Sequence, residues 1–214
     1  MNEANIRSGT ISAIEPQARR PDRVNVFMDG EFAFGLAVTV MVDSGITVGQ
    51  EISERDVRSL LQAEEAGRAI DSAVRLVAYR ARSEAEIRQR LARKGFSSFA
   101  VDIAVTKMRE WRYIDDGEFA RQWVENRGNH RPRSTTLMKH ELATKGIDAA
   151  TAERVVDEAG IDDYGVALDL ARKWLPRIEK EDRETQRRRL TGYLQRRGFN
   201  WDVVRHVLDE SLPR

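Results

Sequence analysis

The chain of 214 residues contains no cysteine, only five prolines and no long apolar run. Without cysteine it can form no disulfide, no thiolate nucleophile and no cysteine-ligated zinc site. The longest run of mainly apolar residues, 34–42, is nine residues long and includes Gly35 and Thr39, far short of the ~20 residues of a membrane-spanning helix. Residues 1–5 have neither a basic start nor an apolar stretch, so we expect no secretory signal. These absences predict a cytoplasmic protein without a membrane partner.

Charge is abundant but unevenly distributed along the chain. Charged residues make up 33% of the sequence, yet the formal net charge is only +1. Residues 1–66 hold six basic and eleven acidic side chains, a net charge of −5, whereas residues 67–214 hold 30 and 24, a net charge of +6. An acidic head and a basic body suggest two modules with different roles. A basic body is compatible with binding to nucleic acid or to an acidic protein surface.

The first 52 residues have the pattern of a small β module. Apolar and polar side chains alternate over residues 24–28, and a second strand-like run, 31–36, follows Asp29-Gly30. An Asp-Gly pair between two such runs predicts a hairpin, because both central residues of a type I′ turn need a positive φ. Residues 10–14 and 46–52 are predicted as further strands. So small a sheet must pack on another element to be stable.

From Ser53 onward the pattern is helical, beginning with a Ser53-x-x-Asp56 helix start. A six-residue motif, Leu-x-x-Lys/Arg-Gly followed by Phe or Ile, recurs with its glycines at Gly95, Gly146 and Gly198. The spacings of 51 and 52 residues indicate a repeated supersecondary unit.

Each copy of the motif predicts the end of a helix. Glycine takes the left-handed position after the last helical turn, and the apolar residues on either side of it form the contact of a Schellman ending. The Lys or Arg before the glycine is favoured by the helix dipole. Replacing such a glycine with a β-branched residue should cost ~1 kcal/mol or more.

The apolar pattern around each glycine defines the fold class. Apolar residues recur 6, 9 and 10 positions after each glycine and 8 positions before it, which predicts a helix on each side. A further helix is predicted to open each unit, over 70–81, 117–127 and 164–175. We therefore expect a mainly α protein with three tandem three-helix repeats in an elongated array, preceded by the small β module. The predicted boundaries are 1–52 for the β module, 53–68 for a linking helix, and 69–114, 115–161 and 162–214 for the repeats.

The middle repeat carries the most specific motif. Residues 113–124 combine a Tyr-apolar-Asp-Asp segment with Phe-Ala-Arg and an aromatic residue, and the pattern continues through the Arg-Pro-Arg segment 131–133 to Gly146. In these residues the chain resembles the RecX family, the regulators of the RecA recombinase. The similarity extends to residues 79–96 of the first repeat and to the head, 24–36, and is weakest in the third repeat. The family usually has glycine after the basic proline segment, where this chain has Ser134.

The resemblance implies a non-enzymatic protein that lies in the groove of the RecA–DNA filament across more than one protomer. Members of the family suppress the ATPase and strand exchange of RecA, within homologous recombination, DNA repair and the SOS response. Some also bind DNA directly, so single- and double-stranded DNA are further expected partners. We expect a monomer with no cofactor, no metal and no catalytic residue.

Basic side chains of the second and third repeats are the candidate contacts for RecA or DNA. The planar guanidinium group of arginine suits both phosphate and carboxylate, although a solvated surface explains such residues equally well. The candidates are Arg121, Arg127, Arg131, Arg133, Lys139 and Lys145 in the second repeat and Arg183, Arg187, Arg188, Arg196 and Arg197 in the third.

The positions of the family motif and the repeated glycines have mainly structural interpretations. Asp115 and Asp116 could form a paired-carboxylate site, but a role at the start of a helix explains them better. Aromatic residues of the motif could stack on bases, yet the i, i+4 spacing of two of them favours core packing. We expect the same packing for Trp111, Trp174 and Trp201. The motif residues assigned mainly structural roles are Tyr113, Asp115, Asp116, Phe119, Ala120, Trp123, Gly95, Gly146 and Gly198.

Two other functions stay open. Three-helix units also occur in DNA-binding proteins, so the chain could be a helical-repeat transcriptional regulator. The helices after each glycine begin without Arg or Lys, which argues against base reading by their first residues. A plain helical interaction scaffold is the third possibility, and salt-insensitive binding to protein alone would favour it. The three scattered histidines match no metal-ligand spacing.

Overall fold

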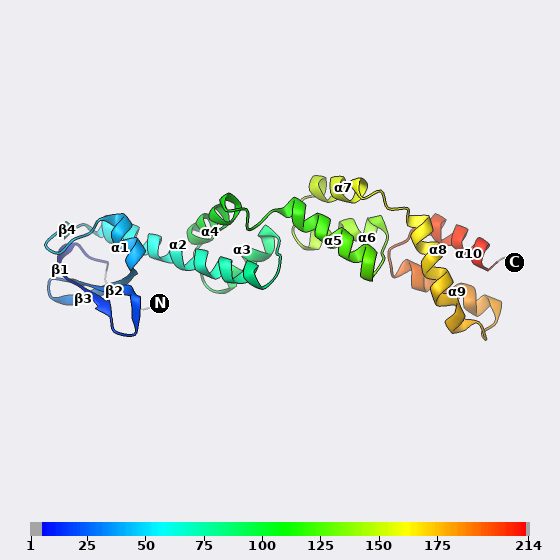
Figure 1. The fold of residues 1–214 in the computed structure, drawn as a ribbon, viewed down its shortest axis with the longest axis horizontal. Helices are drawn as coiled ribbons and strands as arrows, with labels where there is room; N and C mark the ends of the chain where they lie inside the picture. The colour runs from blue at the N-terminus through cyan, green and yellow to red at the C-terminus, as the bar shows by residue number, and fades with distance from the viewer. Residues whose placement is uncertain (1–5, 213–214) are drawn as a thin grey trace. The chain divides into compact units, whose positions relative to one another are not determined.

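The computed structural model describes residues 6–212 (Figure 1). The expected absence of a secretory signal concerns residues 1–5 and lies outside the described residues. The chain forms two compact units. One contains the residues up to Arg80 together with Ile87–Tyr113, and the other contains Ala81–Glu86 together with the residues from Ile114 onward.

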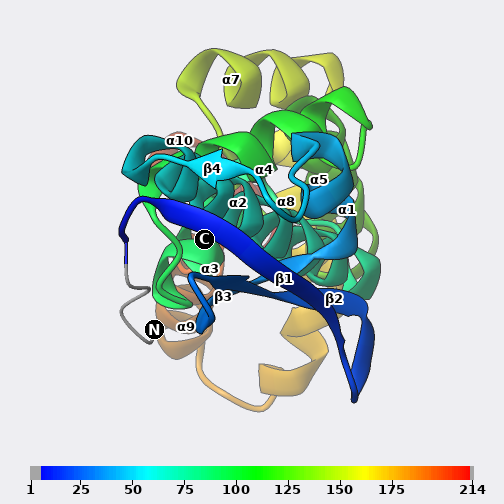
Figure 2. The ribbon, with the colours of Figure 1, turned by 90° about the vertical axis from the view of Figure 1, so that its left-hand side faces the viewer.

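The first unit contains an antiparallel sheet of four strands. The strands are β1 (Gly9–Gln17), β2 (Arg20–Met28), β3 (Glu31–Ala37) and β4 (Glu51–Ile52). They lie in the order β3-β2-β1-β4, and Figure 2 shows β1, β2 and β3 side by side. The predicted hairpin is confirmed, because Asp29 and Gly30 have φ angles of 51° and 84° between β2 and β3.

The structure corrects the prediction for residues 38–52. A short helix, α1 (Val38–Ser44), follows β3, and only the last two residues of the strand predicted over 46–52 are extended. Val38, Val40 and Met41 pack against the core of the β module, so tertiary packing outweighs the β-propensity of valine. Gly45 ends the helix in the left-handed conformation, at φ 64°.

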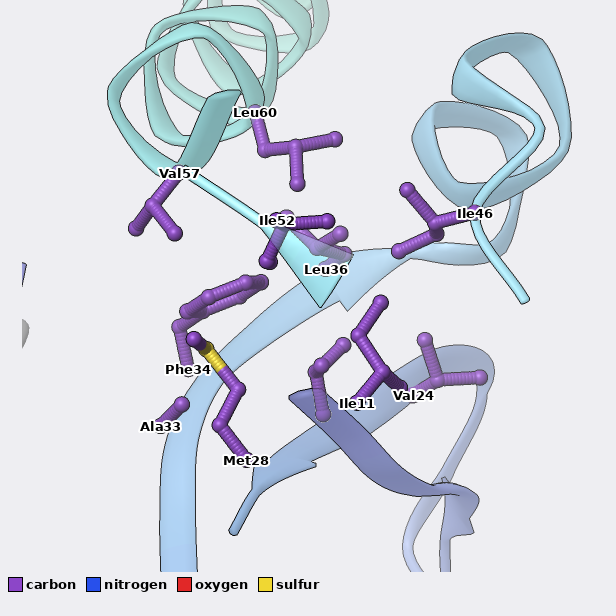
Figure 3. Packing of buried hydrophobic residues seen from close by; sticks show 11 residues of the cluster. Ile11, Val24, Met28, Ala33, Phe34, Leu36, Ile46, Ile52, Val57 and Leu60 are labelled. Carbon is purple, nitrogen blue, oxygen red and sulfur yellow. The ribbon is translucent and has the colours of Figure 1, made fainter. Parts of the chain in front are cut away.

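A long helix, α2 (Glu54–Tyr79), covers the sheet and then continues into the first repeat. Val57 and Leu60 of α2 point into the core between strands and helix, with Leu36 of β3 among their neighbours (Figure 3). The helix begins at the predicted Ser53 capping box. The expected linking helix and the first helix of the repeat are one continuous element, because no proline or turn sequence interrupts residues 54–79.

A buried ion pair fixes α2 to the β module. Glu64 of α2 is only 5% exposed. Arg23 of β2 donates from Nη1 to its carboxylate at 2.5 Å, and the backbone N–H of Ala37 donates to the other oxygen at 2.6 Å. The burial of this carboxylate is compensated because both oxygens accept hydrogen bonds.

The rest of the chain consists of short helices joined by tight turns. The apolar positions that the repeat pattern predicted, including Val105, Val156 and Leu208, are buried, which confirms the pattern. The elements are α3 (Glu84–Arg93), α4 (Ser98–Glu110), α5 (Asp116–His130), α6 (Thr135–Thr144), α7 (Ala149–Glu158), α8 (Asp163–Trp174), the 3₁₀ turn η1 (Leu175–Ile178), α9 (Arg183–Gln195) and α10 (Trp201–Ser211).

The three repeated glycines end α3, α6 and α9 as predicted. Gly95, Gly146 and Gly198 have φ angles of 83°, 79° and 88°. In each copy the N–H after the glycine donates to the carbonyl of the motif leucine, as in Ile147 to Leu142 at 3.1 Å. The Schellman endings inferred from the sequence are therefore confirmed.

Candidate interaction surface of the helical repeats

The Asp115-Asp116 pair joins two helix starts. Asp115 caps its own helix, accepting a hydrogen bond from the Glu118 N–H at 2.9 Å. Asp116 accepts from the N–H of Glu84, at 2.9 Å, in the segment 81–86 of the same unit. Asp115 thus serves the start of its own helix and Asp116 the start of α3, and each carboxylate accepts from a backbone N–H that has no partner within its helix.

Asp162 and Asp163 repeat this arrangement between the second and third repeats. Asp162 caps α8 by accepting from the Tyr164 N–H at 3.0 Å. Asp163 accepts from the N–H and the hydroxyl of Thr135, the first residue of α6, at 2.8 and 2.9 Å. This second pair was not predicted, although two adjacent Asp residues before a helix are a recognisable sequence signal.

The glycine corners lie against the starts of the preceding helices. The hydroxyl of Ser83 donates to the carbonyl of Lys145 at 2.6 Å, and a Cβ on Gly146 would collide with Ala85. The two contacts fall within the second unit. Gly146 is therefore required for close approach as well as for its left-handed backbone.

The third repeat makes the equivalent contact with the second. The N–H of Ser134, the cap of α6, donates to the carbonyl of Arg197 at 3.0 Å. A Cβ on Gly198 would collide with Ser134 and Leu137. By contrast, no atom lies within 4 Å of a Cβ built on Gly95.

Glu141 binds three side chains of the second repeat, two of which are candidate contact residues. Its carboxylate accepts hydrogen bonds from Trp123 Nε1 at 3.0 Å and from Arg127 Nε at 2.7 Å. Arg133 forms an ion pair with the other oxygen, at 2.9 Å from Nε. The Arg127 guanidinium also lies 4.5 Å from the centre of the Trp123 ring. These two arginines therefore stabilise the repeat itself.

Lys145 is likewise engaged within the fold. Its ammonium group lies 3.0 Å from a carboxylate oxygen of Glu86 and 5.1 Å from the centre of the Trp123 ring. The side chains of Lys145 and Glu86 are largely buried. This pair adds to the contact between the Gly146 corner and the segment 81–86.

Two candidates of the third repeat also have partners. Arg187 donates to the carbonyl oxygen of Leu208 at 3.2 Å and to the carboxylate of Asp209 at 3.1 Å, both in the last turns of α10. Arg197 lies 4.2 Å from the centre of the Tyr193 ring, which stacks on Trp174. A cation at a helix C-terminus satisfies carbonyls that have no partner within the helix.

Arg121 and Lys139 form ion pairs at the surface. Arg121 donates from Nε and Nη2 to Glu118, which together with a hydrogen bond from Gln122 lowers the pKa of the Glu118 carboxyl below its usual range. Lys139 lies 2.9 Å from Asp157. Exposed pairs of this kind contribute little free energy and exchange easily for an external partner.

The remaining four candidates are exposed cations. Their side chains form no hydrogen bond or ion pair with residues 6–212, and the four residues are exposed. They are Arg131 in the turn before α6 and Arg183, Arg188 and Arg196 on or directly after α9.

The aromatic residues divide into packed and exposed groups. Phe119 is buried and stacks with Trp123, as predicted, and Trp174 packs in the core of the third repeat. The prediction of core packing is wrong for Trp111 and Trp201, which are 48% and 57% exposed. The mainly structural role assigned to Tyr113 is not supported either, since this residue is 55% exposed. All three lie at or just beyond the end or start of a helix, so their rings reach past the last packed turn.

Among residues 6–212, no group of three or more His, Asp or Glu side chains is placed to hold a metal ion. In the same range no helix combines the length and the apolar character needed to cross a membrane.

The Gly-ended helices that recur after the β module define a tandem helical-repeat protein. Four family models match it in order. The regulatory protein RecX N-terminal domain matches residues 9–53, and the first, second and third three-helix domains of RecX match 69–108, 115–156 and 161–208.

Curated relatives with similar sequences are named regulatory protein RecX. The protein from Bacillus velezensis is 28% identical over 205 residues, covering 94% of this chain and 77% of the relative. The protein from Clostridium beijerinckii is 27% identical and covers 94% and 95%. Because the four matched domains together span most of the sequence, the chain belongs to the RecX family.

Two solved structures share the fold. A crystal structure of regulatory protein RecX aligns with a TM-score of 0.74 and 23% identity, covering 94% of this chain and 98% of the other. The crystal structure of RecX from Lactobacillus salivarius gives a TM-score of 0.61 and 20% identity, covering 69% and 97%.

Proposed function

We propose that this protein is a cytoplasmic, non-enzymatic modulator of RecA that binds in the groove of the RecA–DNA filament and suppresses ATPase and strand exchange. The observation that carries the proposal is the ordered match of all four RecX domains along the chain. Relatives named regulatory proteins support a role in regulation. A ligand shifts a filament between states only by binding one state more tightly than the other.

The eleven candidate residues form two groups with different roles. Five of them, including Arg127 and Arg187, hold the repeats together through partly buried partners. The other six either face solvent or form only exposed pairs, so they can meet acidic groups or phosphates of the filament without leaving a buried charge unpaired. The proposed contacts are Arg121, Arg131, Lys139, Arg183, Arg188 and Arg196.

Charge reversal of exposed arginines tests this division. The triple variant Arg131→Glu, Arg188→Glu, Arg196→Glu should bind the RecA–single-stranded-DNA filament at least tenfold more weakly than the unchanged protein in co-sedimentation. Each reversal removes an attractive contact and adds a repulsive one. The melting temperature should change little, because exposed charges contribute little to stability.

The matched control is Arg19→Glu, Arg55→Glu, Arg93→Glu, which makes the same change in net charge at exposed positions of the first unit. This control should keep most of the filament affinity. If both triple variants lose affinity equally, net charge alone governs binding and the assigned contacts are wrong.

A further inference from the structure

A corner of exposed aromatic and basic side chains follows α4 in the first unit. Trp111, Arg112 and Tyr113 are consecutive and all exposed, the two aromatic residues to 48% and 55%. The ring centres lie 5.9 Å apart with an angle of 67° between the planes. Large aromatic side chains exposed together are typical of an interaction site.

The backbone of this corner is unusual. Arg112 has a φ of 56°, which makes it one of two non-glycine residues with positive φ among residues 6–212. The N–H of Tyr113 donates to the carbonyl of Met108 at 2.8 Å, so α4 ends like the three Gly-ended helices but with arginine at the left-handed position. An L-residue adopts this conformation only at an energetic cost.

The Arg112 side chain has no polar partner among the described residues. It is exposed and forms no hydrogen bond or ion pair with residues 6–212. Glycine would end the helix with less strain, as it does at Gly95. The corner therefore carries an arginine, between two aromatic residues in the sequence, at a position where the left-handed backbone would favour glycine.

We propose that the Trp111–Arg112–Tyr113 corner binds single-stranded nucleic acid, with the rings stacking on bases and the guanidinium contacting a phosphate. Unpaired bases have accessible faces, and aromatic side chains combined with arginine form platforms for them. A duplex keeps its bases stacked inside, so it offers only phosphates to this corner. The proposal goes beyond docking on RecA, because it assigns a direct nucleic-acid contact outside the basic residues of repeats two and three.

The first test measures binding of a labelled oligothymidine by fluorescence anisotropy, with no RecA present. Trp111→Ala should weaken binding about tenfold, since stacking on one aromatic side chain typically changes affinity by that order. Trp201→Ala is the matched control: its ring is 57% exposed at the start of α10 and has no stacking partner within residues 6–212. It should bind like the unchanged protein.

Arg112→Gly separates binding from folding. This variant removes the charge while relieving the left-handed strain, so its melting temperature should equal or exceed that of the unchanged protein. Its affinity for oligothymidine should fall, and the slope of log affinity against log salt should shrink by about 0.7. Arg112→Lys should retain the slope. A merely structural residue would change the melting temperature and leave the slope unchanged.

An abasic oligonucleotide of equal length supplies the phosphates without the bases. The unchanged protein should bind it about tenfold more weakly than oligothymidine, whereas Trp111→Ala should show almost no difference between the two. Binding of a duplex should be weakened by Arg112→Gly and insensitive to Trp111→Ala.

Unchanged oligothymidine binding by both Trp111→Ala and Arg112→Gly would overturn the proposal. If these variants also lost binding to DNA-free RecA, the corner would be a protein-docking surface instead. Failure of the filament proposal would leave the oligothymidine results untouched, because RecA is absent from that assay.

Discussion

Gly198→Ala should destabilise the second unit by about 3 kcal/mol, whereas Gly95→Ala should cost only about 1 kcal/mol. Both glycines occupy the same left-handed position, with φ angles of 88° and 83°. They differ in their surroundings: a Cβ at Gly198 would collide with Ser134 and Leu137, and a Cβ at Gly95 meets nothing within 4 Å. The difference between the two variants therefore isolates the contact between repeats.

Urea unfolding followed by circular dichroism measures both variants. A Gly95→Ala cost close to that of Gly198→Ala would show that backbone strain alone explains the motif. The contact between repeats would then have no measurable role in stability.

Glu141→Ala should destabilise the second unit by about 2 kcal/mol. The substitution removes the acceptor of Trp123 and leaves Arg127 and Arg133 without a counter-charge at a partly buried site. The matched control is Asp157→Ala, which removes the exposed partner of Lys139. This control should stay within about 0.5 kcal/mol of the unchanged protein.

Thermal or urea unfolding of Glu141→Ala and Asp157→Ala measures this difference directly. Equal and small losses for both would contradict the structural role assigned to Glu141. Arg127 and Arg133 would then return to the set of residues free to contact a partner.

Features with a local cause could be predicted from the sequence. The Gly-ended helices follow from the left-handed backbone that Gly95, Gly146 and Gly198 adopt, and the buried positions follow from helical periodicity. The Asp29-Gly30 hairpin depends on two adjacent residues only.

Contacts between distant segments could not be predicted in the same way. Nothing local indicates that Asp116 and Asp163 accept hydrogen bonds from helix starts 32 and 28 residues earlier in the chain. One signal was available: Ser83 and Ser134, which contact the glycine corners, are separated by the same 51 residues as the first two glycines.

Charge patterns in the sequence likewise say little about which cations are free. Arg127 and Arg131 are four residues apart, yet the first contacts Glu141 and the second faces solvent. The packing of α1 and the exposure of Trp111 depend on tertiary surroundings for the same reason. The proposed boundaries of the repeats stay a prediction.

The most direct test of the proposed function is the single-stranded-DNA-dependent ATPase of RecA, measured while this protein is titrated. If one molecule binds in the filament groove across several RecA protomers, as the family resemblance implies, suppression should occur at less than one molecule per RecA protomer. The triple variant Arg131→Glu, Arg188→Glu, Arg196→Glu should reach the same suppression only at a concentration at least tenfold higher than the unchanged protein. Full ATPase activity at excess unchanged protein, with filament length unaltered, would contradict the account.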